Sequence, residues 1–189
     1  MPLTTLKNFA EYARAALPDG LDLSKVDLWF QDESRVGQQG STTRQWTIKG
    51  TRPRAIQQCQ FTYAYIYGAV CPSSGEAVGL VLPSVNGEAM KLHLQAISDA
   101  VPEGRHALLI VDGAAWHSKN YELSNITLLK LPPYSPELNP VEQVWQWLKQ
   151  RFLSNRCFED YQSIVDAWNE FRSDRGRVHQ MCSRLWAKL

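Results

Sequence analysis

The chain has 189 residues, of which 44% are hydrophobic and 21% are charged, and its formal net charge is +1. These values are typical of one globular domain and exclude a disordered or strongly basic chain. Basic residues are nevertheless concentrated in two segments. Residues 34–75 hold five basic residues and no acid, and residues 171–189 hold five basic residues and one acid. Such segments favour local binding of anions.

The four cysteines show neither a CxxC pair nor a zinc-ligand spacing, which excludes a disulfide framework and a structural zinc site. No stretch approaches the roughly 18 apolar residues of a membrane span, and the N-terminus lacks the apolar run of a signal peptide. We therefore expect a soluble cytoplasmic protein without a membrane partner.

The first part of the chain is predicted to hold one short helix followed by strands. Apolar residues at helical spacing predict a leader helix, and we expect residues 1–22 to form this helix and a linker. Strands are predicted at four places, which are Val26–Gln31, around Gln45–Ile48, Phe61–Tyr67 and Ala77–Leu82. We expect the first three to form a meander and the last to return as a hairpin partner.

The rest of the chain alternates helices and strands. Periodicity predicts a buried helix over Asn86–Val101, and the apolar run His106–Val111 is typical of a central strand covered on both faces. Further elements are predicted as a strand at Ile126–Leu131, a helix from Asn139 to about Phe152, and a helix at Tyr161–Arg172. This order predicts an α/β domain over residues 23–172 with a ribonuclease-H-like fold, a mixed central sheet flanked by helices. Residues 173–189 are expected to form a basic helical tail.

Three acidic residues lie at the ends of these predicted elements. Asp32 follows the first strand, Asp112 follows the central strand, and Glu142 lies in the first turn of the helix that begins at Asn139. Ligands bind at strand ends in open α/β sheets, so we expect the three carboxylates to share one crevice. An all-oxygen site of this kind suits Mg²⁺ or Mn²⁺, and paired ions promote phosphoryl transfer.

Each acid also has a structural interpretation. Asp32 could cap a loop, and Asp112 with Gly113 could mark a turn. Glu142 would stand at the third helical position if Asn139 is the N-cap, where a glutamate closes a capping box. The residues taken singly leave both interpretations open.

Four segments together resemble one protein family. Residues 131–145, LPPYSPELNPVEQVW, closely resemble the signature around the last acid of mariner-like DDE transposases, and most closely their bacterial insertion-sequence branch. Residues 29–34, WFQDES, resemble the first acidic motif of that family, and residues 111–117, VDGAAWH, resemble the second. Residues 46–53, WTIKGTRP, resemble the segment that follows the first motif.

The resemblance implies a ribonuclease-H-like catalytic domain that cleaves DNA and then transfers the strand, using two Mg²⁺ or Mn²⁺ ions. Carried over by motif, the catalytic and metal-binding triad is Asp32, Asp112 and Glu142. The implied partners are transposon ends, target DNA and a second copy of the chain, in the cytoplasm of a bacterium and associated with its nucleoid.

The chain departs from the family pattern in two respects. The last two acids are 30 positions apart, somewhat closer than usual. Only about 25 residues precede the first strand, where family members carry helix-turn-helix modules. We therefore expect a catalytic half whose DNA-binding half is encoded separately, or a truncated remnant. A nuclease without strand transfer and an inactive DNA-binding remnant are the alternative functions.

Five further residues are candidate DNA contacts. Lys49, Arg52 and Arg54 lie close in sequence after the first acid and could bind the phosphate backbone, or form an ordinary solvated face. His117 could contact a phosphate or make a structural hydrogen bond. Lys149 lies seven positions after Glu142 and could reach DNA, or be a plain exposed lysine.

Overall fold

The computed structural model describes residues 9–37, 46–52, 54, 63–114, 121, 123–131, 139–154 and 162–183. These ranges contain five strands, β1 (Val26–Gly37), β2 (Tyr63–Cys71), β3 (Glu76–Leu82), β4 (His106–Val111) and β5 (Ile126–Lys130). They also contain five α-helices, α2 (Phe9–Ala16), α3 (Gly87–Ala100), α4 (Val141–Leu148), α5 (Gln162–Arg172) and α6 (Arg175–Cys182). A π-helical turn, Lys149–Leu153, continues α4.

The strands form one mixed sheet in the order β3-β2-β1-β4-β5. β1, β2 and β3 are antiparallel neighbours, whereas β4 runs parallel to β1 and β5 runs parallel to β4. β1 therefore joins the antiparallel half of the sheet to the parallel half. The predicted mixed sheet is confirmed.

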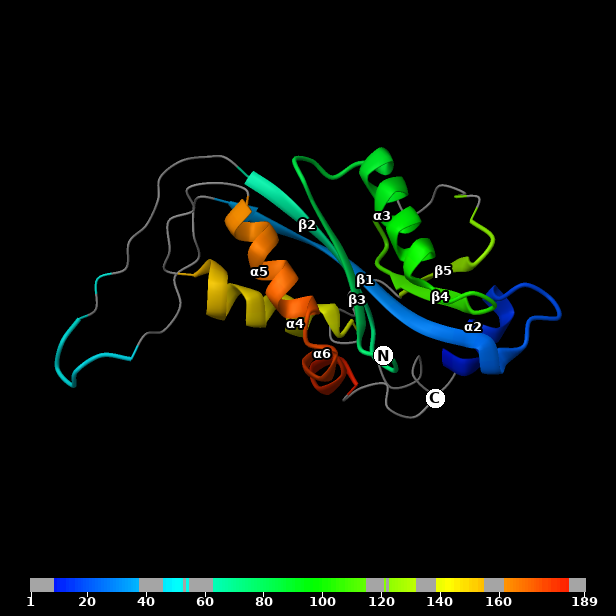
Figure 1. The fold of residues 1–189 in the computed structure, drawn as a ribbon, viewed down its shortest axis with the longest axis horizontal. Coiled ribbons are helices and arrows are strands. Elements are labelled where there is room, and N and C mark those ends of the chain that lie inside the picture. The colour runs from blue at the N-terminus through cyan, green and yellow to red at the C-terminus, as the bar shows by residue number, and fades with distance from the viewer. Residues whose placement is uncertain are drawn as a thin grey trace.

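Helices cover both faces of this sheet, with α4, α5 and α6 on one face and α3 on the other (Figure 1). Alternate residues of β1 contribute to the two hydrophobic clusters, as Phe30 packs with Val144 and Trp145 of α4 while Trp29 packs with Met90 of α3. All six residues of β4 are buried, as the sequence predicted for an apolar strand that is covered on both faces. Among the described helices, none is both long enough and apolar enough to cross a bilayer.

Two predictions about strands were wrong. β1 does not end before Asp32 but continues to Gly37, because residues 30–37 pair with β2. Residues 46–48 do not form a strand; they belong to a loop closed by the Thr51 amide donating to the Ile48 carbonyl at 3.0 Å. Trp46 and Ile48 are exposed at 105% and 80%, so their apolar character reflects no packing against the sheet. Gln45 lies outside the described residues.

Two glycines in neighbouring strands make room for two tryptophans. Gly68 of β2 and Gly79 of β3 are paired across the sheet. A Cβ atom on Gly68 would lie 2.5 Å from Trp145 of α4, and one on Gly79 would lie 2.2 Å from Trp168 of α5. Both indoles are buried, and their ring centroids are 5.7 Å apart. The absence of side chains at these two positions therefore sets how closely α4 and α5 approach the sheet.

We expect Gly79→Ala to lower the free energy of unfolding by about 2–3 kcal/mol, because the added methyl group overlaps a ring that is packed on all sides. Urea denaturation monitored by circular dichroism would measure this loss. Gly113→Ala is the matched control, since a Cβ atom there meets nothing within 4 Å. A loss at residue 79 no greater than at residue 113 would contradict the packing argument.

Candidate active site

Asp32 lies in the interior of β1, on the sheet face that α4 covers. Side chains alternate along a strand, so Asp32 shares this face with the core residue Phe30. The Trp145 indole Nε1–H of α4 donates a hydrogen bond to the Asp32 Oδ2 atom at 2.8 Å. The carboxylate is therefore partly buried and held by a neutral donor from the opposite element.

Asn139 attaches the start of α4 to the strand residue next to Asp32. Its Nδ2 donates to the backbone carbonyl of Gln31 at 2.9 Å, and its Oδ1 accepts from the backbone N–H of Val141 at 3.1 Å. Asn139 is buried, so both bonds are shielded from water. The beginning of α4, which carries Glu142, is thereby fixed beside β1.

The position of Glu142 in its helix differs from the capping-box prediction. The helix begins at Val141 with Pro140 as N-cap, so Glu142 is the second helical residue and not the third. The Asn139 side chain caps the first helical N–H, and the Glu142 backbone N–H donates to the Asn139 carbonyl at 3.2 Å. An acid in the first turn still interacts favourably with the helix dipole.

The bonds from Asn139 and Trp145 to β1 place Glu142 near Asp32, and its charge acts on the Asp32 carboxyl group. Burial raises the pKa of Asp32 from 3.8 to about 7; the Trp145 hydrogen bond opposes this shift, and the negative charge of Glu142 adds to it. Two carboxylates within Coulombic reach in a partly buried place repel each other. The structure therefore brings together two of the three predicted acids.

Asp112 directly follows β4, as predicted, at the carboxyl end of that strand. The last paired residues of β1 and β4 are Phe30 and Ile110, so Asp32 and Asp112 each lie two residues further along neighbouring parallel strands. Asp112 is exposed, and its Oδ1 accepts from the Ala114 backbone N–H at 2.9 Å. Within the described ranges, no three His, Cys, Asp or Glu side chains are grouped closely enough to hold a metal ion.

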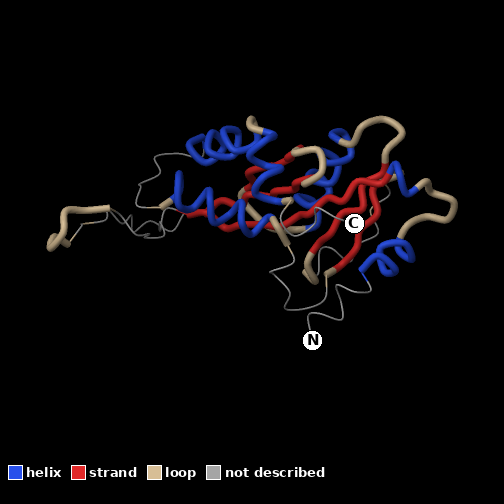
Figure 2. Tube along the Cα trace, turned by 90° about the horizontal axis from the view of Figure 1, so that it is seen from below, coloured by secondary structure: helices blue, strands red, loops and turns tan. Residues whose placement is uncertain are grey.

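The candidate DNA contacts lie in different places. Lys49, Arg52 and Arg54 are all exposed. The loop that contains the first two projects far from the sheet (Figure 2). Lys149 is exposed at the end of α4. His117 lies outside the described residues, as does Glu137. The structure thus separates the projecting basic loop from the paired carboxylates.

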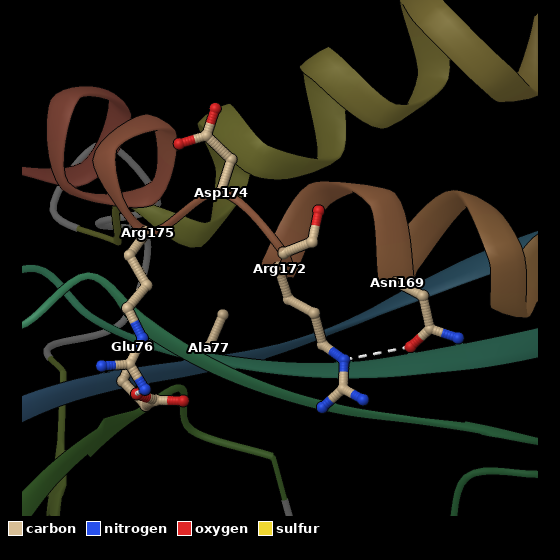
Figure 3. Close-up of a pocket in the computed structure, with 7 residues that line it drawn as sticks. Glu76, Ala77, Asn169, Arg172, Asp174 and Arg175 are labelled. Carbon is tan, nitrogen blue, oxygen red and sulfur yellow. Dashed lines mark hydrogen bonds and ion pairs between the residues drawn. The ribbon is translucent and has the colours of Figure 1, made fainter.

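The described part of the second basic segment is used for internal contacts. Around a hollow of about 690 Å³ beside β3, Arg175 forms an ion pair with Glu76 at 2.5 Å, and the Arg172 Nε–H donates to Asn169 at 3.0 Å (Figure 3). Arg177 pairs with Asp174 at 3.3 Å. Arg175 thus attaches α6 to β3, and Arg177 attaches α6 to α5 by donating to the Glu170 carbonyl at 3.2 Å, whereas Arg172 bonds within α5.

A comparison with protein families identifies the domain. The family described as DDE superfamily endonuclease matches residues 27–165, a range that includes Asp32, Asp112 and Glu142. The chain belongs to the DDE superfamily of endonucleases. A relative from Sinorhizobium fredii (strain NBRC 101917 / NGR234), described as uncharacterized protein y4pE/y4sA, is 49% identical over 131 residues, which cover 66% of this chain and 97% of the relative.

Solved structures of Mos1 share the fold of this DDE endonuclease. The Mos1 mariner paired-end complex with Mn matches with a TM-score of 0.70 at 16% identity, covering 97% of this chain and 57% of that one. The Mos1 strand transfer complex matches with a TM-score of 0.68 at 15% identity, covering 96% of this chain and 56% of that one. This likeness confirms the ribonuclease-H-like fold. The DDE endonuclease chain spans little more than half the length of the Mos1 chains.

Sequence reasoning anticipated that Asn139 caps the start of this helix, but in this DDE endonuclease it did not find the bond from Asn139 to Gln31 or the bond from Trp145 to Asp32. Trp145 belongs to the apolar stripe of α4, so periodicity predicts only that it is buried. The available signal was its indole N–H, because a buried tryptophan usually needs a hydrogen-bond acceptor. Trp145 lies one helical turn after the predicted site residue Glu142, so an acid of the site was a candidate acceptor.

Proposed function

We propose that this DDE endonuclease is the catalytic domain of a mariner-like DNA transposase of the bacterial insertion-sequence type. In this proposal it cleaves DNA strands at the ends of a mobile element and joins the released 3′-hydroxyl to target DNA. The observation that carries the proposal is the pairing of Asp32 on β1 with Glu142 on α4, with Asp112 level with Asp32 on the next strand. Two acids from separate elements, with a third at the end of the neighbouring parallel strand, are candidate ligands and catalytic groups for phosphoryl transfer.

The donor set fits divalent cations. Asp32 and Glu142 offer hard oxygen ligands, and a cation between them would offset the repulsion that helps raise the pKa of Asp32. We infer that Asp32, Asp112 and Glu142 hold two Mg²⁺ or Mn²⁺ ions. When bound, such ions polarise the phosphate and stabilise charge on the attacking and leaving oxygens. The paired-end complexes of Mos1 have been solved with Mn and with Mg.

The contribution of the protein itself is negative charge in a fixed arrangement. Asp32 must be ionised to bind a cation, and Trp145 and Asn139 hold it and the start of α4 in place. No side chain forms a covalent bond to DNA in this scheme: a water oxygen attacks first and the 3′-hydroxyl second. Each step exchanges one phosphorus–oxygen bond for another, so no ATP is needed.

We further propose DNA as the partner of the projecting basic loop, through Lys49 and Arg52, with Arg54, His117 and Lys149 as additional contacts. A second copy of the chain and a separately encoded helix-turn-helix half are the proposed protein partners, in the bacterial cytoplasm at the nucleoid. One of the Mos1 paired-end complexes contains the left transposon end, which supports DNA as the ligand.

The proposal is tested by incubating the chain with Mg²⁺ and labelled DNA that carries the ends of the element flanking its gene. Joined products together with cleaved ends would support transposition, and excess chelator should abolish both. Cleavage without joining would support a nuclease. The third outcome is binding to the ends without cleaved or joined products, both for the chain alone and for the chain with the helix-turn-helix half. That outcome would support an inactive remnant.

Binding of DNA by this chain is expected to be mainly electrostatic, so its affinity should fall steeply with salt and differ little between element ends and random duplex. Replacing Lys49, Arg52 and Arg54 with glutamine should reduce the slope of log K against log salt by about 0.9 for each phosphate that the variant no longer neutralises. Fluorescence anisotropy at several salt concentrations measures this slope. Lys91→Gln, on the exposed side of α3, is the control. An unchanged slope in the triple variant would assign DNA binding to another surface.

A further inference from the structure

α4 carries Glu142, and two side chains attach this helix to β1 on either side of that acid. Asn139 binds the carbonyl of Gln31, and Trp145 binds the carboxylate of Asp32 in the next position of the strand. The two bonds join residues 108 and 113 positions apart in sequence. They fix the rotation and the height of α4 over the strand, and with them the separation of the two acids.

We propose that Trp145 is a positioning residue of the active site, whose indole N–H orients the Asp32 carboxylate toward Glu142 and the cations they hold. This inference rests on the proposed function, because it concerns the same metal site. It adds a residue that is neither acidic nor in contact with the reacting atoms.

The position of the indole itself is determined by the glycine in β2. Gly68 is the cross-strand neighbour of Asp32, and a Cβ atom there would lie 2.5 Å from the Trp145 ring. The ring thus lies over Gly68 with its N–H directed at the adjacent Asp32. It is 3% exposed and lies against the β2 backbone at Gly68, so it has no room to turn away.

A neutral donor suits this task better than a charged one. An arginine or lysine at this place would also orient Asp32, but its positive charge would compete with the cations for the carboxylate. The indole N–H binds Oδ2 and leaves the negative charge of the group intact. Hydrogen-bond partners of metal ligands typically change metal affinity or activity by about 10–100-fold when they are removed.

Trp168 provides a matched control on the same face of the sheet. It lies over Gly79 as Trp145 lies over Gly68, and it is equally buried. Its Nε1 atom has no hydrogen-bond partner among the described residues. Replacing Trp168 with phenylalanine therefore removes a similar packing contact without removing a hydrogen bond to an acid.

The experiment compares the parent, Trp145→Phe and Trp168→Phe. Binding of Mn²⁺ to the DNA-free protein is measured by electron paramagnetic resonance, and the Mg²⁺ dependence of cleavage is measured alongside. Trp145→Phe should weaken Mn²⁺ binding by about tenfold and raise the Mg²⁺ concentration for half-maximal cleavage by a similar factor. Trp168→Phe should leave the Mn²⁺ affinity and the Mg²⁺ concentration for half-maximal cleavage within about twofold of the parent values. It should lower the melting temperature by about as much as Trp145→Phe does.

Equal Mn²⁺ affinity in the parent and Trp145→Phe would overturn this inference and leave the proposed function intact. A parent that binds no Mn²⁺ with or without DNA would overturn both. If Trp145→Phe does not fold, the ¹⁵N-indole spectra of the parent and Asp32→Asn decide the question. The Trp145 indole signal must then move more than that of Trp168, and equal movement would overturn the inference.

Discussion

Asp32→Asn is expected to abolish DNA cleavage and, at the same time, to make the metal-free protein more stable above neutral pH. Cleavage is lost because asparagine supplies no negative charge to a divalent cation. Stability rises because the folded state raises the pKa of Asp32 from 3.8 to about 7, which means that folding disfavours its ionised form.

The pH dependence follows from that shift. Below about pH 4 the carboxyl group is protonated in both the folded and the unfolded state, so the substitution has little effect. As the pH rises toward 7, the unfolded parent ionises while the folded parent resists, and the parent loses stability relative to the variant. Above about pH 7 the difference should level off at an order of 2–4 kcal/mol.

Thermal melting of both proteins from about pH 4 to 8, without metal, measures this difference. Saturating Mg²⁺ should then stabilise the parent and leave Asp32→Asn unchanged, because ligand binding to the folded state raises its stability. A variant that is less stable than the parent at every pH would show that the Asp32 carboxylate is a structural group and not a strained functional one.

Glu142→Gln is expected to eliminate cleavage and strand transfer, by at least about a hundredfold, while the fold without metal remains intact. Glutamine keeps the volume of the side chain but removes the charge that a hard cation requires. Stability should change little, because the Asn139 side chain caps the first N–H of α4 and because removing the Glu142 charge relieves the repulsion on Asp32, which offsets the lost interaction with the helix dipole.

Glu33→Gln is the matched control for this substitution. Glu33 also raises the pKa of Asp32 by its charge, but strand alternation directs it to the opposite face of the sheet. Single-turnover cleavage and melting should be measured for both variants. Retained cleavage in Glu142→Gln would return this residue to a purely structural role, and Glu137 would be the next acid to examine.

Much of the fold could be predicted because local pattern and tertiary packing agree. The apolar run of β4 and the periodic stripe of α4 match their burial. The extension of β1 could not be predicted, because Asp32, Glu33 and Ser34 are typical of a strand end. These residues continue the strand because their backbone groups form hydrogen bonds with β2. The strand prediction at residues 46–48 was wrong because the exposed Trp46 and Ile48 mimic a buried strand.

The site divides in the same way. The acids could be recognised by motif, and Asp112 by its place after an apolar strand. The hydrogen bond from Trp145 to Asp32 could not, because no periodicity within a helix specifies a partner 113 positions away. The pairing of Gly68 with Asp32 likewise depends on the register between two strands, which a single sequence determines only weakly.

The attachment of α4 to β1 also has a consequence for the time at which activity arises during synthesis. Asp32 belongs to β1, the first of the described strands, whereas Glu142 and Trp145 emerge from the ribosome more than a hundred residues later. Contacts of such long sequence separation form late in folding. A nascent chain that has not reached α4 therefore holds one acid without its counterpart. If the proposed function holds, cleavage is expected only after nearly the whole domain has been translated, so that incomplete products leave DNA uncut.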